Sequence, residues 1–350
     1  MVKFRLERVS APLWFRPLIP LIALLVTFLL TTLLVLWAGA DPLKVYYYFL
    51  IAPLSSRVAL IEVLVKSTPL LLTGASVAFA FSAGYWNIGA EGQLYAGAMA
   101  GAWLGMFLGG VSPVAGIPLM MAGGFLAGAV WAFGPAILKT RLNVDEVVTT
   151  LLLNSVILFL VSYLLNGPWR SPVSMWPQSP EIAQGAHYFR LLPRARLHFG
   201  FVVGLAVIVI EWFVLQHTPL GLRMRAVGLG KKAAQFAGLN VNRTMLVAAL
   251  ISGGIAGLAG VGEVAGIHFH LIESISDGLG YSGIIIATLG GLHPFGVGLA
   301  AFFIGLIDTG AQSLSRALGV PVYLGTVVQA ILLLVTLSLF VLQNYRLRRA

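Results

Sequence analysis

The sequence of 350 residues contains no cysteine and few charged residues, since only 10% of its side chains are Asp, Glu, Lys or Arg. The absence of cysteine excludes disulfide bonds, thiolate metal ligands and cysteine nucleophiles. An ordinary soluble domain carries about 25% charged residues, so this chain lacks the charge to cover a water-exposed surface of its size. The composition therefore excludes an ordinary soluble protein.

Most of the chain is apolar: 59% of its residues are hydrophobic, and the mean hydropathy is +0.93. Apolar runs of about 20 residues recur along the chain, which is the length of a transmembrane helix. The strands of a membrane barrel would instead show alternating segments of about ten residues. These features predict an all-α integral membrane protein, a polytopic helical bundle of about 10 transmembrane helices. The predicted spans are residues 17–39, 67–83, 88–108, 114–138, 146–165, 200–215, 244–267, 279–292, 296–313 and 322–343.

The distribution of basic residues predicts the orientation. Most of the 22 Lys and Arg residues, including those of the N-terminal segment 1–16, fall on one side of the predicted spans, and that side is expected to be cytoplasmic. Ten spans return the basic C-terminal tail to the same side. The first apolar run is longer than the core of a signal peptide, so we expect a retained signal anchor. The net charge of +10 is explained by topology and by attraction to anionic lipid, without a nucleic-acid partner.

Two connecting segments need separate interpretation. Residues 41–66 mix tyrosines with scattered charges and are predicted to lie at the membrane interface. Residues 166–199 carry four arginines although they fall outside, so we expect a folded external loop there.

Glycine is abundant, with 40 residues, and many glycines follow one another at four-residue spacing. This spacing puts small residues on one face of a helix and lets helix backbones approach closely. We therefore predict tight helix packing at Gly97, Gly101 and Gly105, at Gly124 and Gly128, at Gly253 and Gly257, and at Gly262 and Gly266.

The stretch GYWNIGAEGQLY, residues 84–95, places polar side chains between two long apolar runs. A carboxylate such as that of Glu91 costs about 2.5–3.5 kcal/mol at the centre of a bilayer, so it has to face protein, water or a partner. Asn87, Glu91 and Tyr95 follow at four-residue spacing and predict a polar stripe on one helix face, with Gln93 on the other side. Three interpretations remain open: a buried hydrogen-bonded cluster with Asn87 as helix cap, a direct contact with a solute, and a proton relay.

Other polar residues inside predicted spans are further candidates for a translocation path. Glu263 and Asp308 are acids deep in spans, and no basic residue is placed in the sequence to neutralise them. Asp145 and Glu146 suit a helix N-terminus, whereas the polar residues after them lie further along the span. His268 and His270 lie near Glu263, but their spacing predicts no metal site. The candidate path residues are Asn87, Glu91, Tyr95, Thr149, Thr150, Asn154, Glu263 and Asp308.

The predicted cytoplasmic loop, residues 217–243, holds five basic residues and no acid. Lys231 to Gly238 is predicted to be a short helix with a glycine stop. The glycines before it do not form a phosphate loop, because Arg225 stands at the first glycine position and Lys232 stands where Ser or Thr is required. The chain therefore shows no catalytic residues and no nucleotide-binding motif of its own.

Four stretches in order carry a resemblance to a known family: GYWNIGAEGQLYAGA (84–98), NVDEVVTTLLLN with the following LNGPW, RAVGLGKKAAQFAGLNV (225–241) and GYSGIIIATLGGLHPFGVGLAA (280–301). They resemble the permease subunits of binding-protein-dependent ABC importers, in the simple-sugar and nucleoside branch whose external partner is a lipoprotein. The chain departs from the family pattern at Leu229-Gly230, where a glutamate-asparagine pair is usual. The departure touches the cytoplasmic loop only.

The resemblance implies a single permease domain over residues 1–350, in the bacterial cytoplasmic (inner) membrane, with both termini cytoplasmic. Its implied partners are a cytoplasmic ABC ATPase, a second and paralogous permease, an external solute-binding protein and membrane lipid. The chain itself binds no cofactor, since ATP and Mg belong to the ATPase. The implied coupling residues, whose small apolar face enters a groove of the ATPase, are Arg225, Gly228, Lys231, Ala233, Ala234, Phe236 and Gly238.

The implied solute is a purine nucleoside or a simple sugar, which neutral hydrogen-bonding groups suit better than an ion. The alternative function is a proton-coupled secondary transporter that uses Glu91, Glu263 or Asp308. A secondary transporter works alone in liposomes under a gradient, whereas an ABC permease is inert without its ATPase.

Overall fold

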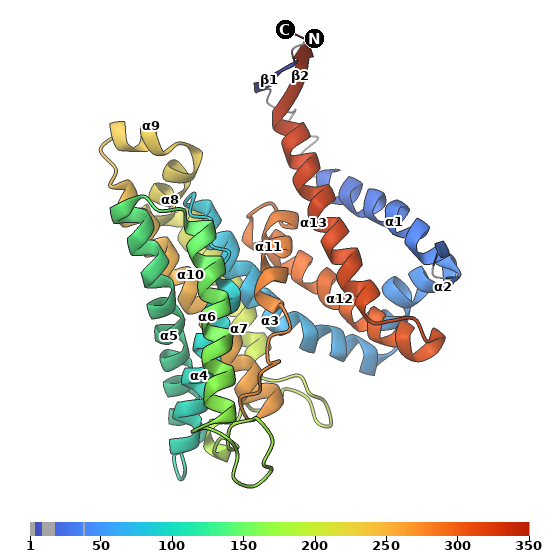
Figure 1. Ribbon diagram of the computed structural model, residues 1–350, viewed down its shortest axis with the longest axis vertical. Helices are drawn as coiled ribbons and strands as arrows, with labels where there is room; N and C mark the ends of the chain where they lie inside the picture. Colours follow the sequence, from blue (N-terminus) through green and yellow to red (C-terminus); the bar gives the residue numbers. More distant parts are fainter. Residues whose placement is uncertain (1–3, 9–17, 38, 350) are drawn as a thin grey trace. The chain divides into compact units, whose positions relative to one another are not determined.

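The computed structural model describes residues 4–8, 18–37 and 39–349, and this part of the chain is helical almost throughout (Figure 1). All ten predicted spans coincide with helices, so the all-α membrane fold is confirmed. The exception is one antiparallel pair of short strands, β1 (Phe4–Arg8) and β2 (Tyr345–Arg349), near the two ends of the chain. Residues 1–3 and 9–16 of the predicted basic N-terminus lie outside the described residues.

The helices follow one another with short connections, except between α6 and α7. Their bounds are α1 Ile19–Trp37, α2 Pro42–Tyr46, η2 Tyr47–Ile51, η3 Ala52–Leu54, α3 Arg57–Ser82, α4 Ala90–Phe107, α5 Pro113–Leu142, α6 Glu146–Asn166, η4 Gln184–Ala186, α7 Gly200–His217, α8 Pro219–Leu229, α9 Lys231–Phe236, α10 Val241–Glu263, η5 Val264–His268, α11 Leu279–Leu289, α12 Pro294–Leu318 and α13 Tyr323–Asn344.

The chain is a multi-pass membrane protein. In its described part, six helices are long and apolar enough to cross a membrane, namely α3, α5, α6, α7, α10 with η5, and α12. Shorter apolar helices lie within α1, α11 and α13. α11 has 11 residues, so it rises about 16 Å, roughly half of the 30 Å hydrocarbon layer.

Residues 60–305 form one compact unit, in which α4, α5 and α10 pack against one another. Glycines set these crossings, as predicted. A Cβ added at Gly97 would overlap the backbone of Gly257, and one at Gly128 would overlap the carbonyl of Gly253. Gly262 is the exception, because nothing lies within 4 Å of the Cβ it would carry. The helices therefore touch through their backbones, with almost no side chain between them.

The two ends of this unit are different. Figure 1 shows α8 and α9 at one end and the long connection between α6 and α7 at the other. That connection is folded, as predicted. Its Ile182 backbone N–H donates to the carbonyl of Phe269 at 2.9 Å, and Tyr188 donates in the same way to Ala265. Arg196, one of its four arginines, forms an ion pair with Glu62 of α3 at 2.5 Å.

The second compact unit comprises residues 1–59 and 306–350. Within it, α1 packs along α13. The Tyr46 hydroxyl donates to the carbonyl of Phe28 at 2.5 Å, which ties α2 to α1. The predicted interfacial segment 41–66 forms α2, η2, η3 and the first turns of α3, and its position at a membrane surface stays a prediction.

Candidate functional site

The segment between α3 and α4 is not helical, and it holds a fully buried asparagine. α3 ends at Ser82, Gly84 takes a φ of +67°, and α4 begins only at Ala90. Between them, the Asn87 side chain accepts the backbone N–H of Gly89 at 2.9 Å through Oδ1. This contact is a turn closed by a short polar side chain, which leads the chain into the helix.

Asn87 also binds two side chains from inside the bundle. Its Nδ2 donates to Gln93 Oε1 at 2.8 Å and to Ser252 Oγ of α10 at 2.9 Å, while Gln93 Nε2 returns a bond of 3.0 Å to Asn87 Oδ1. The Ser252 hydroxyl donates to the carbonyl of Ser76 in α3 at 2.7 Å. Each side-chain oxygen and nitrogen of Asn87 and Gln93 thus has a hydrogen-bond partner inside the protein.

The predicted polar stripe is therefore wrong. Asn87 precedes the helix, so the four-residue spacing does not place it on the face of Glu91 and Tyr95. Gln93, which was expected on the opposite side, is its hydrogen-bond partner. Of the three interpretations of this stretch, the structure favours the buried hydrogen-bonded cluster. The predicted role of Asn87 as helix cap is wrong, because the N-cap of α4 is Gly89, whose N–H the Asn87 side chain accepts.

Glu91 joins α4 to the N-terminus of α11. Its side chain is 3% exposed, Oε1 accepts the backbone N–H of Gly278 at 3.2 Å, and Oε2 accepts that of Gly280 at 2.7 Å. Asp277 and Gly278 take φ values of +46° and +90°, which turns these N–H groups toward the carboxylate. An acid at a helix N-terminus satisfies free backbone donors and matches the helix dipole. Here the acid comes from a different helix.

The contact between the two helix starts is close. A Cβ added at Gly280 would overlap the backbone of Glu91, so only glycine fits there. Asn154 of α6 holds the other side: its Nδ2 donates to the carbonyl of Ile88 at 3.0 Å and to the Tyr281 hydroxyl at 3.1 Å. Its Oδ1 accepts the Gly92 N–H at 2.9 Å. We call this meeting point of α4, α6 and α11 the helix-start junction.

The two threonines that precede Asn154 do not take part in this network. The Thr150 hydroxyl donates to the carbonyl of Glu146 at 2.7 Å, and Thr149 donates to that of Asp145 at 3.0 Å. Both hydroxyls thus bond back to their own helix, although the Cβ of Thr150 lies against Gly89.

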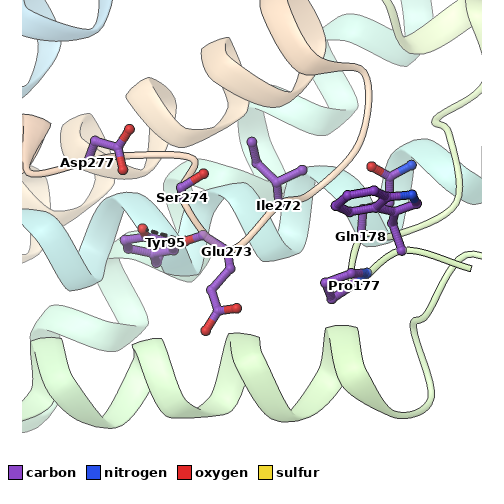
Figure 2. Close-up of a pocket in the computed structure, with 8 residues that line it drawn as sticks. Tyr95, Pro177, Gln178, Ile272, Glu273, Ser274 and Asp277 are labelled. Atoms are coloured by element: carbon purple, nitrogen blue, oxygen red, sulfur yellow. Dashed lines mark hydrogen bonds between the residues drawn. The ribbon is translucent and has the colours of Figure 1, made fainter.

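Tyr95 leads from the junction to a cavity. Its hydroxyl donates to the backbone carbonyl of Glu273 at 2.8 Å, as the dashed line in Figure 2 shows. Beside it lies an open pocket of about 520 Å³. We call this cavity the Trp176 pocket; it is lined by Tyr95, Trp176, Pro177, Gln178, Ile272, Glu273, Ser274 and Asp277.

The last two path candidates, Glu263 and Asp308, have their partners outside the junction. Glu263, the last residue of α10, is buried, and its carboxylate lies 3.7 Å from His268 Nε2. Asp308 belongs to the second compact unit, where Gln329 Nε2 donates to its Oδ1 at 2.5 Å. In the described part of the chain, no group of three His, Asp or Glu residues could hold a metal ion.

Sequence reasoning missed several residues of this region. Gly278 and Gly280 complete the junction, and Ser252 completes the Asn87 cluster. An Asp-Gly pair before an apolar helix is a turn signal, and it could have marked Asp277 and Gly278. No local pattern could have placed Trp176 opposite Glu273, since the two lie on separate segments.

The predicted cytoplasmic loop packs directly on the segment before α4. A Cβ at Gly228 would overlap the carbonyl of Ser82, and the Lys231 side chain lies beside Gly84. Gly238 ends the loop helix with a φ of +83°, as its predicted role as a glycine stop requires. Arg225 Nη1 donates to Gln216 Oε1 of α7 at 2.9 Å.

Ala234 does not belong to the outer face of α9, which corrects the prediction. It is 4% exposed and packs in a core cluster with Tyr85 and Val227 of the same chain. The predicted face fails because α9 turns this alanine inward, toward the start of α4. The most exposed apolar residues of the loop are Phe236, at 96%, and Leu229, at 88%, and Leu222, Ala233 and Ala237 are exposed as well.

Burial perturbs one histidine in the folded connection between α6 and α7. His198 is 1% exposed and packs against Gly266 of η5, and its Nδ1 accepts the Gly200 N–H at 3.1 Å. Loss of hydration lowers the pKa of its imidazole to about 4. The ring is therefore neutral at physiological pH.

Comparison with known proteins gives a family match over most of the chain. The family described as "Branched-chain amino acid transport system / permease component" matches residues 59–337. This range contains the helix-start junction, the Trp176 pocket and the predicted cytoplasmic loop. No solved structure matches the chain.

Individual relatives fall into two groups by printed name. A glucose ABC transporter permease protein of Haloferax volcanii is 33% identical over 349 residues, which cover 97% of this chain and 92% of the relative. A guanosine ABC transporter permease protein of Bacillus subtilis is 35% identical, with 82% of each chain covered. A second guanosine permease protein of the same bacterium is 29% identical, covering 72% of this chain and 80% of the relative.

Proposed function

The chain belongs to the permease-component family of ABC importers, and from this premise we propose that it forms part of the membrane path by which a purine nucleoside enters the cell. A permease of this family is a transport subunit and not an enzyme, since separate ATPase subunits hydrolyse ATP. We propose that ATP and Mg bind to those subunits alone, and that this chain needs no cofactor.

The observation that carries the proposal is the family match over residues 59–337, which runs through both compact units. It supports a single permease domain over residues 1–350. The helix-start junction supports a path for a neutral solute, because amides, hydroxyls and backbone groups dominate it. Tyr281 is the partly exposed polar residue there, and its hydroxyl can donate to and accept from a neutral solute, whereas Asn87 and Asn154 are buried and bonded inside the protein.

The junction gives no support to a proton-coupled transporter. Both oxygens of Glu91 accept backbone N–H groups, so this carboxyl has a structural role between two helices. Glu263 lies next to His268, away from the junction.

A simple sugar is the second candidate solute. One observation favours it: the glucose permease protein of Haloferax volcanii is similar along nearly the whole chain. The guanosine permeases of Bacillus subtilis favour a nucleoside, and their presence as two relatives in one bacterium supports a paralogous permease partner for this chain.

We place the ATPase at α8 and α9 and the solute-binding protein at the opposite end of the same unit. By the parity of the ten predicted spans, both termini are then cytoplasmic, and the connection between α6 and α7 lies outside. The basic residues of the loop support it through the charge rule for cytoplasmic loops, as does the exposed Phe236, which offers an apolar anchor to a partner. The membrane is then the bacterial cytoplasmic membrane.

The test is transport by the reconstituted complex in proteoliposomes. The permease, its second permease, the ATPase and the binding protein are assembled, and uptake of radiolabelled guanosine and glucose is measured with ATP. We expect ATP-dependent guanosine uptake that is lost without the ATPase. Uptake by the permease alone under a proton gradient would contradict the proposal, and ATP-driven uptake of glucose only would replace nucleoside by sugar.

A further inference from the structure

The Trp176 pocket has the size and the position of a solute site. Its volume of about 520 Å³ falls within the range of roughly 300–1,000 Å³ that small-molecule pockets occupy. Three of its lining residues, Trp176, Pro177 and Gln178, belong to the connection between α6 and α7. Figure 1 shows this connection at the end of its unit opposite α8 and α9, and Figure 2 shows the pocket in close-up.

Two chain segments hold the walls of the pocket in place. Gln178 pairs with Ile272 in an isolated β-bridge, and next to it the Ser179 N–H donates to the carbonyl of Leu271 at 2.9 Å. Figure 2 shows Tyr95, Ser274 and Asp277 at one end of the pocket and Pro177 and Gln178 at the other. The pocket is thus a fixed feature of the fold, built from α4 and from segments far apart in the sequence.

An exposed indole lies at the pocket. The Trp176 side chain is 72% exposed, although burying a tryptophan is strongly favourable. It sits in a proline-flanked loop rather than on a helix that faces lipid. A flat aromatic surface of this kind stacks on a nucleobase regardless of the base's identity.

The pocket also carries unused acceptors. Glu273 and Asp277 are exposed, and in the described part of the chain neither carboxylate takes part in an ion pair. A carboxylate accepts two hydrogen bonds side by side, which matches the neighbouring hydroxyls of a ribose. Gln178 and Ser274 add an amide and a hydroxyl that both donate and accept.

The pocket is connected to the helix-start junction by its own wall. Asp277 lines the pocket, and the next residue, Gly278, donates its backbone N–H to Glu91. Tyr95 lines the pocket one helical turn beyond Glu91 on α4. A solute in the pocket therefore touches the segment that holds the two helix starts together.

We propose that the Trp176 pocket receives the nucleoside on the outer side of the membrane, with the base stacked on Trp176 and the ribose hydroxyls bound by Glu273 and Asp277. This inference rests on the proposed nucleoside transport and names where the solute is first held by the permease.

The absence of cysteine makes a direct test possible. Ser274→Cys places the single thiol of this chain in the pocket, and a membrane-impermeant maleimide added from outside should label it in right-side-out vesicles that hold the whole complex. Guanosine should slow the labelling, whereas glucose and spermidine should not. Val173→Cys is the matched control, because Val173 is 92% exposed in the same loop but does not line the pocket.

Transport provides the second measurement. Trp176→Ala should lower guanosine uptake at least about fivefold, the lower end of what base stacking contributes. Trp176→Phe should retain most uptake, and Trp103→Ala, at an exposed tryptophan outside the pocket, should behave as the parent protein. Capture of the binding protein by the complex should be the same in all four proteins.

The outcomes separate this inference from the proposed function. If the parent complex imports no nucleoside, the proposed function fails. If it imports guanosine while guanosine leaves Ser274→Cys labelling unchanged and Trp176→Ala transports normally, the pocket proposal is overturned. Protection by spermidine alone would make it a cation site, and loss of binding-protein capture in Trp176→Ala would make it a docking surface; both results would also overturn the proposal.

Discussion

The Oε2 oxygen of Glu91 lies 2.7 Å from the backbone nitrogen of Gly280, a residue 189 positions further along the chain. This bond puts a side chain of one helix at the N-terminus of another. It explains why an acidic side chain is present in an apolar chain: its oxygens accept free N–H groups at a helix N-terminus instead of pairing with a basic side chain.

Substitutions at Glu91 should follow a defined order. Glu91→Gln keeps one acceptor oxygen but places an amide donor against the second N–H, whereas Glu91→Leu leaves both N–H groups buried without a partner, at about 1–3 kcal/mol each. We therefore expect stability and uptake to fall from the parent to Gln and again to Leu. Thermal melting of the purified complex and guanosine uptake measure the two effects. Full loss of uptake in Glu91→Gln, with normal assembly and melting, would point to a proton relay instead.

The glycine crossings predict a sharp contrast between two alanine variants. Gly97→Ala drives a methyl group into the backbone of Gly257, where neither helix can yield without moving the other. Gly262→Ala meets nothing within 4 Å and should be nearly neutral. Overpacking of this kind costs about 1–3 kcal/mol or more. Melting temperatures in detergent provide the comparison. Equal melting temperatures for both variants would contradict this prediction, because they would show that α4 and α10 move apart at Gly97 without loss of stability.

Coupling to the ATPase should depend on Phe236 more than on Ala234. Phe236→Asp removes the most exposed apolar side chain of α9, so less ATPase should co-purify with a permease whose melting is unchanged. Ala234→Trp should instead lower the melting temperature of the permease itself, because Ala234 packs against Tyr85 in its core. Gln235→Ala, also on an exposed part of α9, is the control for Phe236. Undiminished ATPase recovery with Phe236→Asp would exclude this anchor.

His198 predicts acid sensitivity. Its pKa is about 4 in the fold and about 6.5 in an unfolded chain, so the unfolded state binds the proton first. The stability that this neutral ring contributes is present above pH 6.5 and declines as the pH falls toward 4, by roughly 2–3 kcal/mol at pH 4.5. Melting of the purified protein between pH 7 and 4.5 should show the loss. His198→Gln, which keeps an acceptor for Gly200, should flatten the slope; the same slope in both proteins would assign the sensitivity to other groups.

Much of the fold could be predicted because a membrane helix can be recognised from the length and apolar composition of its own segment. Length and hydropathy placed all ten helical segments, and four-residue glycine spacing marked the close crossings at Gly97 and Gly257. The short length of α11 was visible too, since its apolar run is brief. These properties depend on residues close in the sequence, and they do not require knowing which distant residues are in contact.

The arrangement of the candidate site could not be predicted, because its partners are distant in the sequence. The predicted polar stripe assumed that Asn87 lies in the helix. The turn between Gly84 and Gly89 moves the helix start to Ala90, so Asn87 meets Gln93 and does not share the face of Glu91. Ser252 and Gly280 reach the segment 84–95 from other helices. Ala234 was misplaced for a related reason: a short helix has two faces, and only the core cluster around Tyr85 shows which one is turned inward.

The crossings of α4, α5 and α10 have a mechanical consequence. Helices that touch backbone to backbone have no long side chains between them to change rotamer, so they cannot slide past one another by small adjustments. These three helices should therefore travel as one stiff block during a transport cycle. The deformation that opens a passage then has to fall on the parts held by a few hydrogen bonds, and the half-length helix α11, anchored to the block through Glu91, is the natural moving part.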